Sequence, residues 1–383
     1  MKIKIKKLES TNESLLKRKK SESKIPLFLF FLTSFLKLSA IIYFLITKFT
    51  KKVTKFIDLH LHLDGAITVD IAKKLSKLQN IPLEAKTDEE LESMLSVGEN
   101  CTSLNEFLHC FSVPNSLLQT KEGISEGIKL IAENIYSHGV IYAEIRFAPQ
   151  KHKEKGLSQE DVVKAALEGL EKIKQSKIPI HVNIILCFMR GDKNDEHNKE
   201  TLKLAHKYLV KDGGVVAVDL AGAEALYKTD KYEELFKEVK KLGIPFTIHA
   251  GEAAGPESVK KAIEFGAARI GHGTRAYFDK SVIELIKEKG IFLEMCPTSN
   301  KQTHAVDNMK EYPFMDYLKQ GIFVTLNTDD MGVERTTIQK EFEYMEKEFN
   351  LNYEQEKIIL LNSVNAAFTT QEVKEELKKQ LCL

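Results

Sequence analysis

The sequence contains few cysteines, and no two of them form a C-x-x-C pair. The five cysteines, an odd number, are scattered along the chain at Cys101, Cys110, Cys187, Cys296 and Cys382. A disulfide framework needs an even set at regular spacing, and a cysteine zinc cluster needs closely paired ligands. Both are therefore excluded as the basis of the fold. The content of 43% hydrophobic and 29% charged residues is that of a soluble globular protein.

Net charge is also nearly absent, at +1 over 383 residues, but the charges are unevenly distributed. Residues 1–55 hold 14 Lys and Arg against 3 Asp and Glu, a net charge of +11, so the remaining residues carry −10. A nucleic-acid-binding protein needs a basic face to meet the phosphates. The acidic body therefore argues against a nucleic-acid partner.

A mostly apolar run of 23 residues, Ile25 to Thr47, follows the basic start of the chain. A membrane span needs about 20 such residues, but Lys37 in its middle costs roughly 2.5–3.5 kcal/mol on insertion scales. Three interpretations stay open: a signal anchor that places the body outside, an amphipathic surface segment, and an extension absent from the native protein because the start codon was assigned too far upstream. The protein is membrane-anchored through residues 25–47 if this extension is real, and cytoplasmic if it is absent. We expect two parts, residues 1–55 and 56–383.

After residue 55, short β-branched runs alternate with charged segments of helical period. Most of the runs are almost continuously apolar, as strands buried on both faces should be. The expected strands are residues 56–63, 140–148, 180–189, 215–221, 245–250, 268–273, 291–296 and 322–328. The expected helices include residues 157–176, 232–243, 256–266 and 280–290, several of which end in the glycine typical of a helix C-cap. Eight strand–helix repeats predict a parallel (β/α)₈ barrel, with a helical insertion at about residues 70–136 after the first strand.

Polar residues gather where the predicted strands end. His60, His62 and Asp64 lie at the carboxyl end of the first strand in "FIDLHLHLDGA", and His249, His272 and the pair Asp329–Asp330 lie at the ends of later ones. Residues two apart in a strand point to the same face, so two imidazoles at that spacing converge. Barrel enzymes build their sites at the carboxyl ends of their strands. Packing alone does not explain charged groups at these positions, since buried charges are paired or bind metals.

Imidazole and carboxylate groups are good Zn²⁺ ligands, and zinc lowers the pKa of a bound water toward ~7. The sequence therefore predicts a zinc site made by His60, His62, His249 and Asp329. Glu252 lies three residues after His249 and is a candidate proton donor if burial raises its pKa. His272 is a candidate for holding or deprotonating the attacking water. Glu144 and Arg146, both on the second strand, are expected to form a structural pair inside the barrel.

Seven ordered motifs give the chain from about residue 56 to its end a specific resemblance to the adenosine deaminase family. They read "HLHLDGA", "EIRFAPQ", "DLAGAE", "HAGEAAGPESV", "IGHGTR", "CPTSN" and "TLNTDD". The stretch "EFLHCFSVPNSLLQT" looks more like the adenosine enzymes than the adenine ones. The resemblance implies a (β/α)₈ catalytic domain over residues 56–383 that deaminates adenosine and deoxyadenosine to inosine and deoxyinosine, releasing ammonia, in purine salvage.

The resemblance also implies a role for each candidate residue. His60, His62, His249 and Asp329 match the ligands of one Zn²⁺ per subunit, and zinc-bound hydroxide attacks the amino-bearing ring carbon. Glu252 matches the proton donor to the neighbouring ring nitrogen, and His272 matches the residue that orients the hydroxide. Four residues match groups that bind the nucleoside: His62, Asp64 at the 5′-hydroxyl, Gly222 through its N–H, and Asp330 as a protonated carboxyl at the five-membered ring.

Two departures from the family pattern are Met331, where proline is common, and Ala223, where an acidic residue is frequent. Neither removes a ligand, but both are positions at which substrate affinity can change. Deamination of another purine, such as adenine, AMP or N6-methyl-AMP, is the close alternative. The strand ends show no obvious cluster of Lys or Arg for a 5′-phosphate, which disfavours AMP. A non-catalytic purine-binding protein is the alternative from another class, and loss of Glu252 or of a ligand would be its signature.

Overall fold

The computed structural model describes residues 52–98, 107, 109–306 and 308–383. The predicted membrane segment, residues 25–47, lies outside these ranges. Within them, no helix has both the length and the apolar character that crossing a membrane requires.

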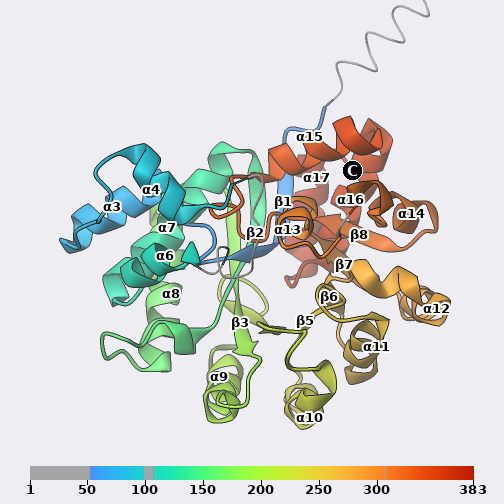
Figure 1. Cartoon of the computed structure of the whole chain (residues 1–383), viewed down its shortest axis with the longest axis horizontal. Helices are drawn as coiled ribbons and strands as arrows, with labels where there is room; N and C mark the ends of the chain where they lie inside the picture. The colour runs from blue at the N-terminus through green and yellow to red at the C-terminus, as the bar shows by residue number, and fades with distance from the viewer. Residues whose placement is uncertain (1–51, 99–106, 108, 307) are drawn as a thin grey trace, which may run out of the picture. The chain divides into compact units, whose positions relative to one another are not determined.

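In the described part of the chain, eight parallel strands confirm the predicted barrel, and each lies within the range expected from the sequence (Figure 1). Their bounds are β1 Phe56–His62, β2 Val140–Phe147, β3 His181–Met189, β4 Val215–Ala221, β5 Thr247–Ala250, β6 Arg269–His272, β7 Phe292–Met295 and β8 Phe323–Leu326. Continuous pairing runs through β1-β2-β3-β4 and through β5-β6-β7-β8. Single bridges, Val218 to Phe246 and Leu61 to Asp329, join the two halves.

The bridge between β1 and β8 involves the residues predicted to bind metal. The N–H of Asp329 donates to the carbonyl of His60 at 2.8 Å, and its carbonyl accepts from the N–H of His62 at 2.9 Å. Asp329 adopts a left-handed backbone with φ of 66°, an uncommon conformation for a residue other than glycine. The closure of the barrel therefore places a carboxylate from the end of the chain between two histidines from its beginning.

Helices follow the strands around the outside of the barrel, as Figure 1 shows for α8 to α12. The predicted insertion between β1 and β2 forms α3 Val69–Gln79, α4 Asp88–Leu95, α6 Ser112–Leu117 and α7 Lys121–Ser137. The other helices are α8 Gln159–Ser176, α9 Asp195–Tyr208, α10 Glu233–Lys241, α11 Pro256–Phe265, α12 Lys280–Lys289, α13 Pro297–Gln302, α14 Phe314–Lys319, α15 Ile338–Phe349, α16 Tyr353–Ala366 and α17 Gln371–Leu381. Gly266 and Gly290 end α11 and α12 in the left-handed conformation, which confirms the predicted glycine C-caps.

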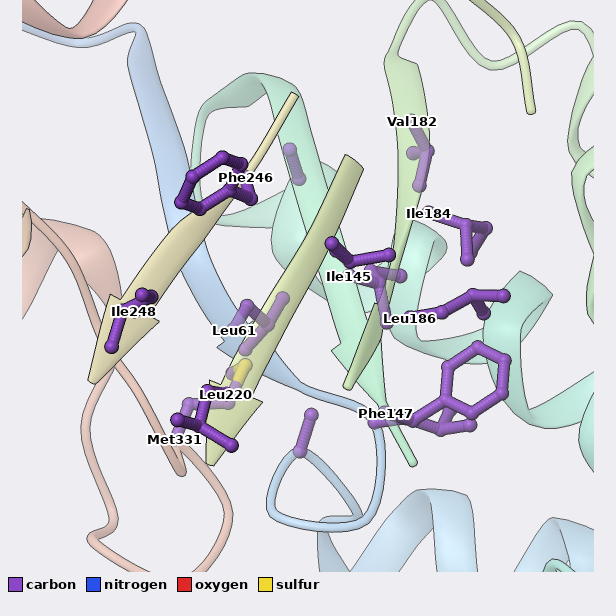
Figure 2. Close-up of a cluster of buried hydrophobic side chains, with 14 of the residues drawn as sticks. Leu61, Ile145, Phe147, Val182, Ile184, Leu186, Leu220, Phe246, Ile248 and Met331 are labelled. Atoms are coloured by element: carbon purple, nitrogen blue, oxygen red, sulfur yellow. The ribbon is translucent and has the colours of Figure 1, made fainter. Parts of the chain in front are cut away.

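The main hydrophobic core lies between the strands and the surrounding helices. Val182, Ile184 and Leu186 alternate along β3 and belong to this core, and Figure 2 shows their side chains one after another along the strand. Asn183 and Cys187, at odd-numbered positions of the same strand, belong to the opposite face, which lines the interior of the barrel. The two faces of one apolar strand therefore have different chemistry.

The barrel interior holds a network of fully buried charges, which corrects the expected pairing of Glu144 with Arg146. Arg146 instead contacts Asp219 and Glu294, each at 2.9 Å, and Glu144 contacts Arg269 at 2.6 Å. All five side chains are shielded from solvent. Glu144 and Arg146 share a face of β2, as their spacing indicates, but each finds its partner across the barrel. Buried charges of this kind need complementary partners at every position.

Candidate metal centre and active site

A cavity of about 440 Å³ opens at the carboxyl ends of the strands. Most of the site residues predicted from the sequence line its wall: His62, Asp64, Gly222, His249, Glu252, His272, Asp329 and Asp330. His60 lies behind this wall and is fully buried. The fold therefore brings all nine residues to one end of the barrel, although the chain separates the first from the last by about 270 positions.

Four donor atoms converge at the base of this cavity. The Nε2 atom of His249 lies 3.1 Å from Nε2 of His60 and 3.3 Å from Nε2 of His62. The Oδ1 atom of Asp329 lies 3.4 Å from Nε2 of His60 and 3.3 Å from Nε2 of His62. These side chains form a group that could hold a metal ion, since their donor atoms all lie within 4.8 Å of one another.

The spacing of the four donors fits a small divalent cation. Ligands arranged tetrahedrally at about 2.0–2.2 Å from zinc lie roughly 3.3–3.6 Å from one another. The four separations given above, 3.1–3.4 Å, lie at or slightly below that range. Three imidazoles and one carboxylate also form a donor set that suits Zn²⁺ better than the hard cations Mg²⁺ and Ca²⁺, which prefer oxygen ligands.

Two buried carboxylates orient the histidines from behind. The Nδ1 atom of His60 lies 2.8 Å from Glu294 Oε2, and Nδ1 of His249 lies 2.9 Å from Asp219 Oδ2. A carboxylate at Nδ1 favours the tautomer that carries its proton there, which leaves the Nε2 lone pair facing the centre. Arg146 bridges both carboxylates, since Nη1 lies 2.9 Å from Asp219 Oδ2 and Nη2 lies 2.9 Å from Glu294 Oε2. One guanidinium group thus fixes the supports of two opposing ligands.

Glu252 and His272 face each other above the metal-binding group. Glu252 Oε2 lies 3.5 Å from Nε2 of His272, which lies 3.6 Å from Asp329 Oδ2. The pKa of Glu252 is raised to about 8. Burial is the main cause, and the negative charges of Asp329 and Glu224 contribute to the same rise. Burial also holds the pKa of His272 well below its usual value, and the surrounding histidines lower it further. These two shifts favour a protonated carboxyl and a neutral imidazole near neutral pH.

The tautomer of His272 is set by a short chain of hydrogen bonds. Asn300 Nδ2 lies 3.0 Å from Nδ1 of His272, and the hydroxyl of Tyr312 donates to Asn300 Oδ1 at 3.0 Å. Because the amide nitrogen is a donor, Nδ1 of His272 acts as the acceptor and Nε2 carries the proton. His272 also has a left-handed backbone with φ of 62°, which turns its ring toward the cavity at the end of β6.

The two aspartates after β8 have different surroundings. Asp329 Oδ2 accepts a hydrogen bond of 2.8 Å from the hydroxyl of Ser299, on α13. Asp330 faces the cavity, where burial and the neighbouring charges of Asp329 and Asp64 hold its pKa well above the usual range. Gly65 makes room for Asp330, since a Cβ atom at Gly65 would lie 1.7 Å from Asp330 Oδ1. The first carboxyl therefore belongs to the metal-binding group, and the second remains available as a hydrogen-bond donor.

The rest of the cavity wall is formed by a backbone turn, apolar rings and two cationic side chains. Gly222 follows β4 with φ of 101°, and a Cβ atom there would meet Met189 at 3.2 Å. Lys151 and Arg275 also line the cavity, although no cationic cluster was expected at the strand ends. Arg275 donates to the carbonyls of Ala253 and Ala305. The rings of three phenylalanines are also part of the wall: Phe107, Phe111 and Phe147.

The supporting residues were not identified from the sequence as parts of the site. Glu294 carries a signal for such a role, because it is a charged residue inside the apolar strand "IFLEMC". Asp219 carries the same signal in "VVAVDLA". Asn300 and Ser299 have only their place after a strand end, and that place does not indicate which ligand each of them contacts.

Comparisons with known proteins agree with this architecture. The family model described as adenosine deaminase matches residues 56–382. An adenosine deaminase of Haemophilus ducreyi is 47% identical over 322 residues, which cover 84% of this chain and 94% of that protein. The solved structure of adenine deaminase from Arthrobacter aurescens superposes with a TM-score of 0.77 at 24% identity, covering 86% of this chain and 98% of that one. An amidohydrolase structure from Burkholderia ambifaria with bound Zn superposes with a TM-score of 0.74 at 18% identity, covering 86% of this chain and 89% of that one.

Proposed function

The chain belongs to the adenosine deaminase family, and on that basis we propose that it catalyses the hydrolytic deamination of adenosine and 2′-deoxyadenosine. The products are inosine or deoxyinosine and ammonia, and the partner is a small nucleoside. The observation that carries the proposal is the convergence of four donor atoms at the base of the cavity, directly below Glu252 and His272. Residues 56–383 form the catalytic domain in this proposal, and residues 1–55 are an extension outside it.

The proposal includes one Zn²⁺ ion held by His60, His62, His249 and Asp329, whose spacing and donor chemistry fit it. When bound, zinc supplies hydroxide near neutral pH by lowering the pKa of water. Glu294 and Asp219 hold two of the ligating imidazoles with their Nε2 atoms toward the ion. The protein thereby pre-organises the imidazoles of His60 and His249 for metal binding.

The remaining side chains bind the nucleoside and move protons. Glu252 in its protonated form donates a proton to the ring nitrogen beside the amino-bearing carbon, which makes that carbon electrophilic. Neutral His272, which carries its proton on Nε2, orients the attacking oxygen through that N–H, and the proton that the attacking oxygen loses goes to the amino group. The carbon gains a bond to oxygen and loses its bond to nitrogen, and the amino group leaves as ammonia after protonation.

Four residues orient the substrate in this proposal. Asp330 as a protonated carboxyl donates to a nitrogen of the five-membered ring, and its raised pKa supports this state. The N–H of Gly222 binds a further ring nitrogen, Asp64 meets the 5′-hydroxyl of the ribose, and His62 lies against the nucleoside. Several directional contacts on one rigid substrate place the reacting carbon within reach of the attacking oxygen.

The test is an assay of the zinc-loaded protein on five substrates: adenosine, 2′-deoxyadenosine, adenine, AMP and N6-methyl-AMP. We expect ammonia release, and the accompanying change in ultraviolet absorbance, with the two unphosphorylated adenine nucleosides. The variant Glu252→Gln should bind zinc and fold normally while kcat falls by roughly 10²–10⁴-fold, the usual contribution of general acid–base catalysis. The matched control is Glu264→Gln, on the exposed face of α11, which should retain full activity.

The second candidate is deamination of a nucleoside monophosphate or of the free base adenine. Lys151 and Arg275 in the cavity wall favour a test with AMP. Preferred turnover of AMP would assign these cations to a 5′-phosphate. Asp64 opposes that assignment, because a carboxylate at the 5′ end repels a phosphate. Binding of adenosine without ammonia release by the zinc-loaded protein would instead indicate a non-catalytic purine-binding protein.

A further inference from the structure

Glu224 is a buried residue of the cavity wall, and its carboxylate binds one loop at several points. Glu224 follows β4, is 2% exposed, and faces the loop between β5 and α11. Its Oε1 accepts from Gly251 N at 2.7 Å and from Ser258 Oγ at 2.5 Å. Its Oε2 accepts from the N–H groups of Glu252, Ala253 and Ala254 at 3.1, 2.8 and 2.9 Å. Four consecutive backbone donors therefore meet one carboxylate.

The loop needs such an acceptor because its N–H groups have no other regular partner. Residues 251–254 leave β5 and precede α11, whose N-cap residue, Gly255, offers no side-chain oxygen. Consecutive N–H groups that converge in this way form an anion-binding concavity, and hydrogen bonds to a carboxylate are roughly twice as strong as neutral ones. The conformation of the loop thus depends on a side chain from a different strand end.

Glu252, the proposed proton donor, is the second residue of this loop. Its own N–H and those on both sides are bound by Glu224, so the position of its Cα atom is fixed from behind. The side chain then extends to the opposite side, where it contacts Thr303 and lies 3.5 Å from Nε2 of His272. A proton donor must be placed within a fraction of an ångström of its acceptor, since a displacement of about 1 Å can cost ~10²-fold in rate.

We propose that Glu224 is a positioning residue for Glu252, acting by clamping the loop of residues 251–254 through its carboxylate. The inference rests on the proposed function, because it assigns a support to the proton donor of that reaction. Glu224 does not contact the substrate in this account. It affects the reaction by holding the loop backbone that carries Glu252.

A second connection from Glu224 leads toward the metal site, and the test must separate it from the first. Ser258 Oγ lies 2.7 Å from Thr229 Oγ1, and Arg190 donates both to Thr229 Oγ1 at 3.1 Å and to the carbonyl of His249 at 2.6 Å. Loss of Glu224 could therefore disturb His249. A disturbance of that ligand lowers zinc affinity, whereas a displaced Glu252 leaves zinc affinity unchanged.

The first experiment compares Glu224→Gln with the wild type as full-length, zinc-loaded proteins. In the variant, an NH2 group replaces one of the two carboxylate oxygens of Glu224. The loop N–H groups that this oxygen bound then face a donor and lose their acceptor. We expect kcat for adenosine to fall by roughly 10–100-fold, with KM changed by less than about threefold and zinc affinity unchanged in a chelator competition. The matched control is Glu356→Gln, on α16, which is also 2% exposed and should keep the wild-type kcat.

The second experiment distinguishes positioning from general damage by a double-mutant cycle with Glu252→Gln. If Glu224 acts through the proton donor, Glu224→Gln should lower the residual kcat of the Glu252→Gln protein by less than about threefold, because coupled residues are not additive. Equal fold-losses in both backgrounds would overturn the proposal, and so would a loss of zinc affinity that accounts for the fall in kcat.

Hydrogen exchange of the wild-type protein measures the hydrogen bonds of the loop amides directly, and it does not depend on whether Glu224→Gln folds. The amides of residues 251–254 should exchange slowly in the zinc-loaded protein, although they belong to a loop at the cavity wall. Rapid exchange of these amides would overturn the clamp. The failure of the proposed function has a different signature: a wild-type protein that releases no ammonia from adenosine. A wild-type protein that is active, with a Glu224→Gln variant equal to it, would refute the positioning role alone.

Discussion

Arg146 and Glu294 form a buried ion pair in which Nη2 lies 2.9 Å from Oε2, the same oxygen that faces Nδ1 of His60 at 2.8 Å. Through its other nitrogen, Nη1, Arg146 holds Asp219, which supports His249. The guanidinium plane can bridge two carboxylates because its donors point in fixed, divergent directions. A single residue at the centre of the barrel therefore supports two metal ligands that come from different halves of the sheet.

Replacing Arg146 with lysine should weaken metal binding. The ammonium group keeps the charge but cannot bridge Asp219 and Glu294, so the imidazoles lose part of their support. Changes at such outer partners typically cost 10–100-fold in metal affinity, and we expect a loss of that size in a chelator competition for zinc. The control is Arg335→Lys, since the side chain of Arg335 contacts Glu92 at 3.5 Å and Ser96 at 2.7 Å and is part of neither support. Equal zinc affinities for both variants and the wild type would contradict this account.

The alternation of apolar runs and charged helices predicted the barrel correctly, because a strand covered on both faces is almost continuously apolar. The same logic predicted that polar residues after the strands would meet, since the carboxyl ends of parallel strands share one edge. His60 and His249 were found in this way, and their convergence follows from the closure of the barrel.

The pairing inside the barrel was not predictable, because sequence spacing gives the face of a strand but not the partner across it. Glu144 and Arg146 share a face and were expected to pair, yet each has an oppositely charged partner on another strand. Glu224 shows the same limit: its position in "DLAGAE" does not reveal that it binds a loop whose amides lie 27 to 30 residues later.

The pH profile of kcat should have its upper limit set by Glu252. This carboxyl must be protonated to act as the proton donor, and burial raises its pKa to about 8. As pH rises through that pKa the protonated fraction falls, so kcat should decline by about tenfold per pH unit on the alkaline side. A zinc ion nearby favours the charged carboxylate, which places the decline at or below pH 8 in the loaded enzyme. A kcat that rises between pH 8 and pH 9.5 would show that Glu252 is not the proton donor.

The variant Gly65→Ala should disturb Asp330 without touching the metal ligands directly. A Cβ atom at this position would lie 1.7 Å from Asp330 Oδ1, so the carboxyl must leave its place at the cavity wall. If Asp330 binds the five-membered ring, the loss of one hydrogen bond should lower kcat/KM for adenosine by roughly 10-fold. Steady-state kinetics and zinc content should be measured together. The control is Gly98→Ala, because a Cβ atom there has no neighbour within 4 Å; unchanged kinetics in Gly65→Ala would remove Asp330 from substrate binding.

Glu341 should make the protein less stable as pH rises from about 5 to 8. This side chain of α15 is fully buried, where it accepts from Thr298 N at 3.1 Å and from the hydroxyl of Thr336. Burial raises its pKa from 4.5 to about 7, so in this window the folded protein holds a proton that the unfolded chain has released. Stability from that proton is fully present below pH 4.5 and is lost as pH rises through 7, a change of up to about 3 kcal/mol in the free energy of unfolding.

In Glu341→Gln this contribution is absent, because the amide does not titrate and can still accept from Thr298 and donate to Thr336. Urea denaturation at pH 5 and pH 8 should therefore show a smaller loss of unfolding free energy in the variant than in the wild type. Zinc binding is itself pH-dependent, but it contributes equally to both proteins and cancels in the comparison. The control is Glu343→Gln, on the exposed side of the same helix, which should follow the wild type. If Glu341→Gln lost as much stability as the wild type over this range, the carboxyl of Glu341 would be ionised throughout, and its burial would have to be offset by its two hydrogen bonds alone.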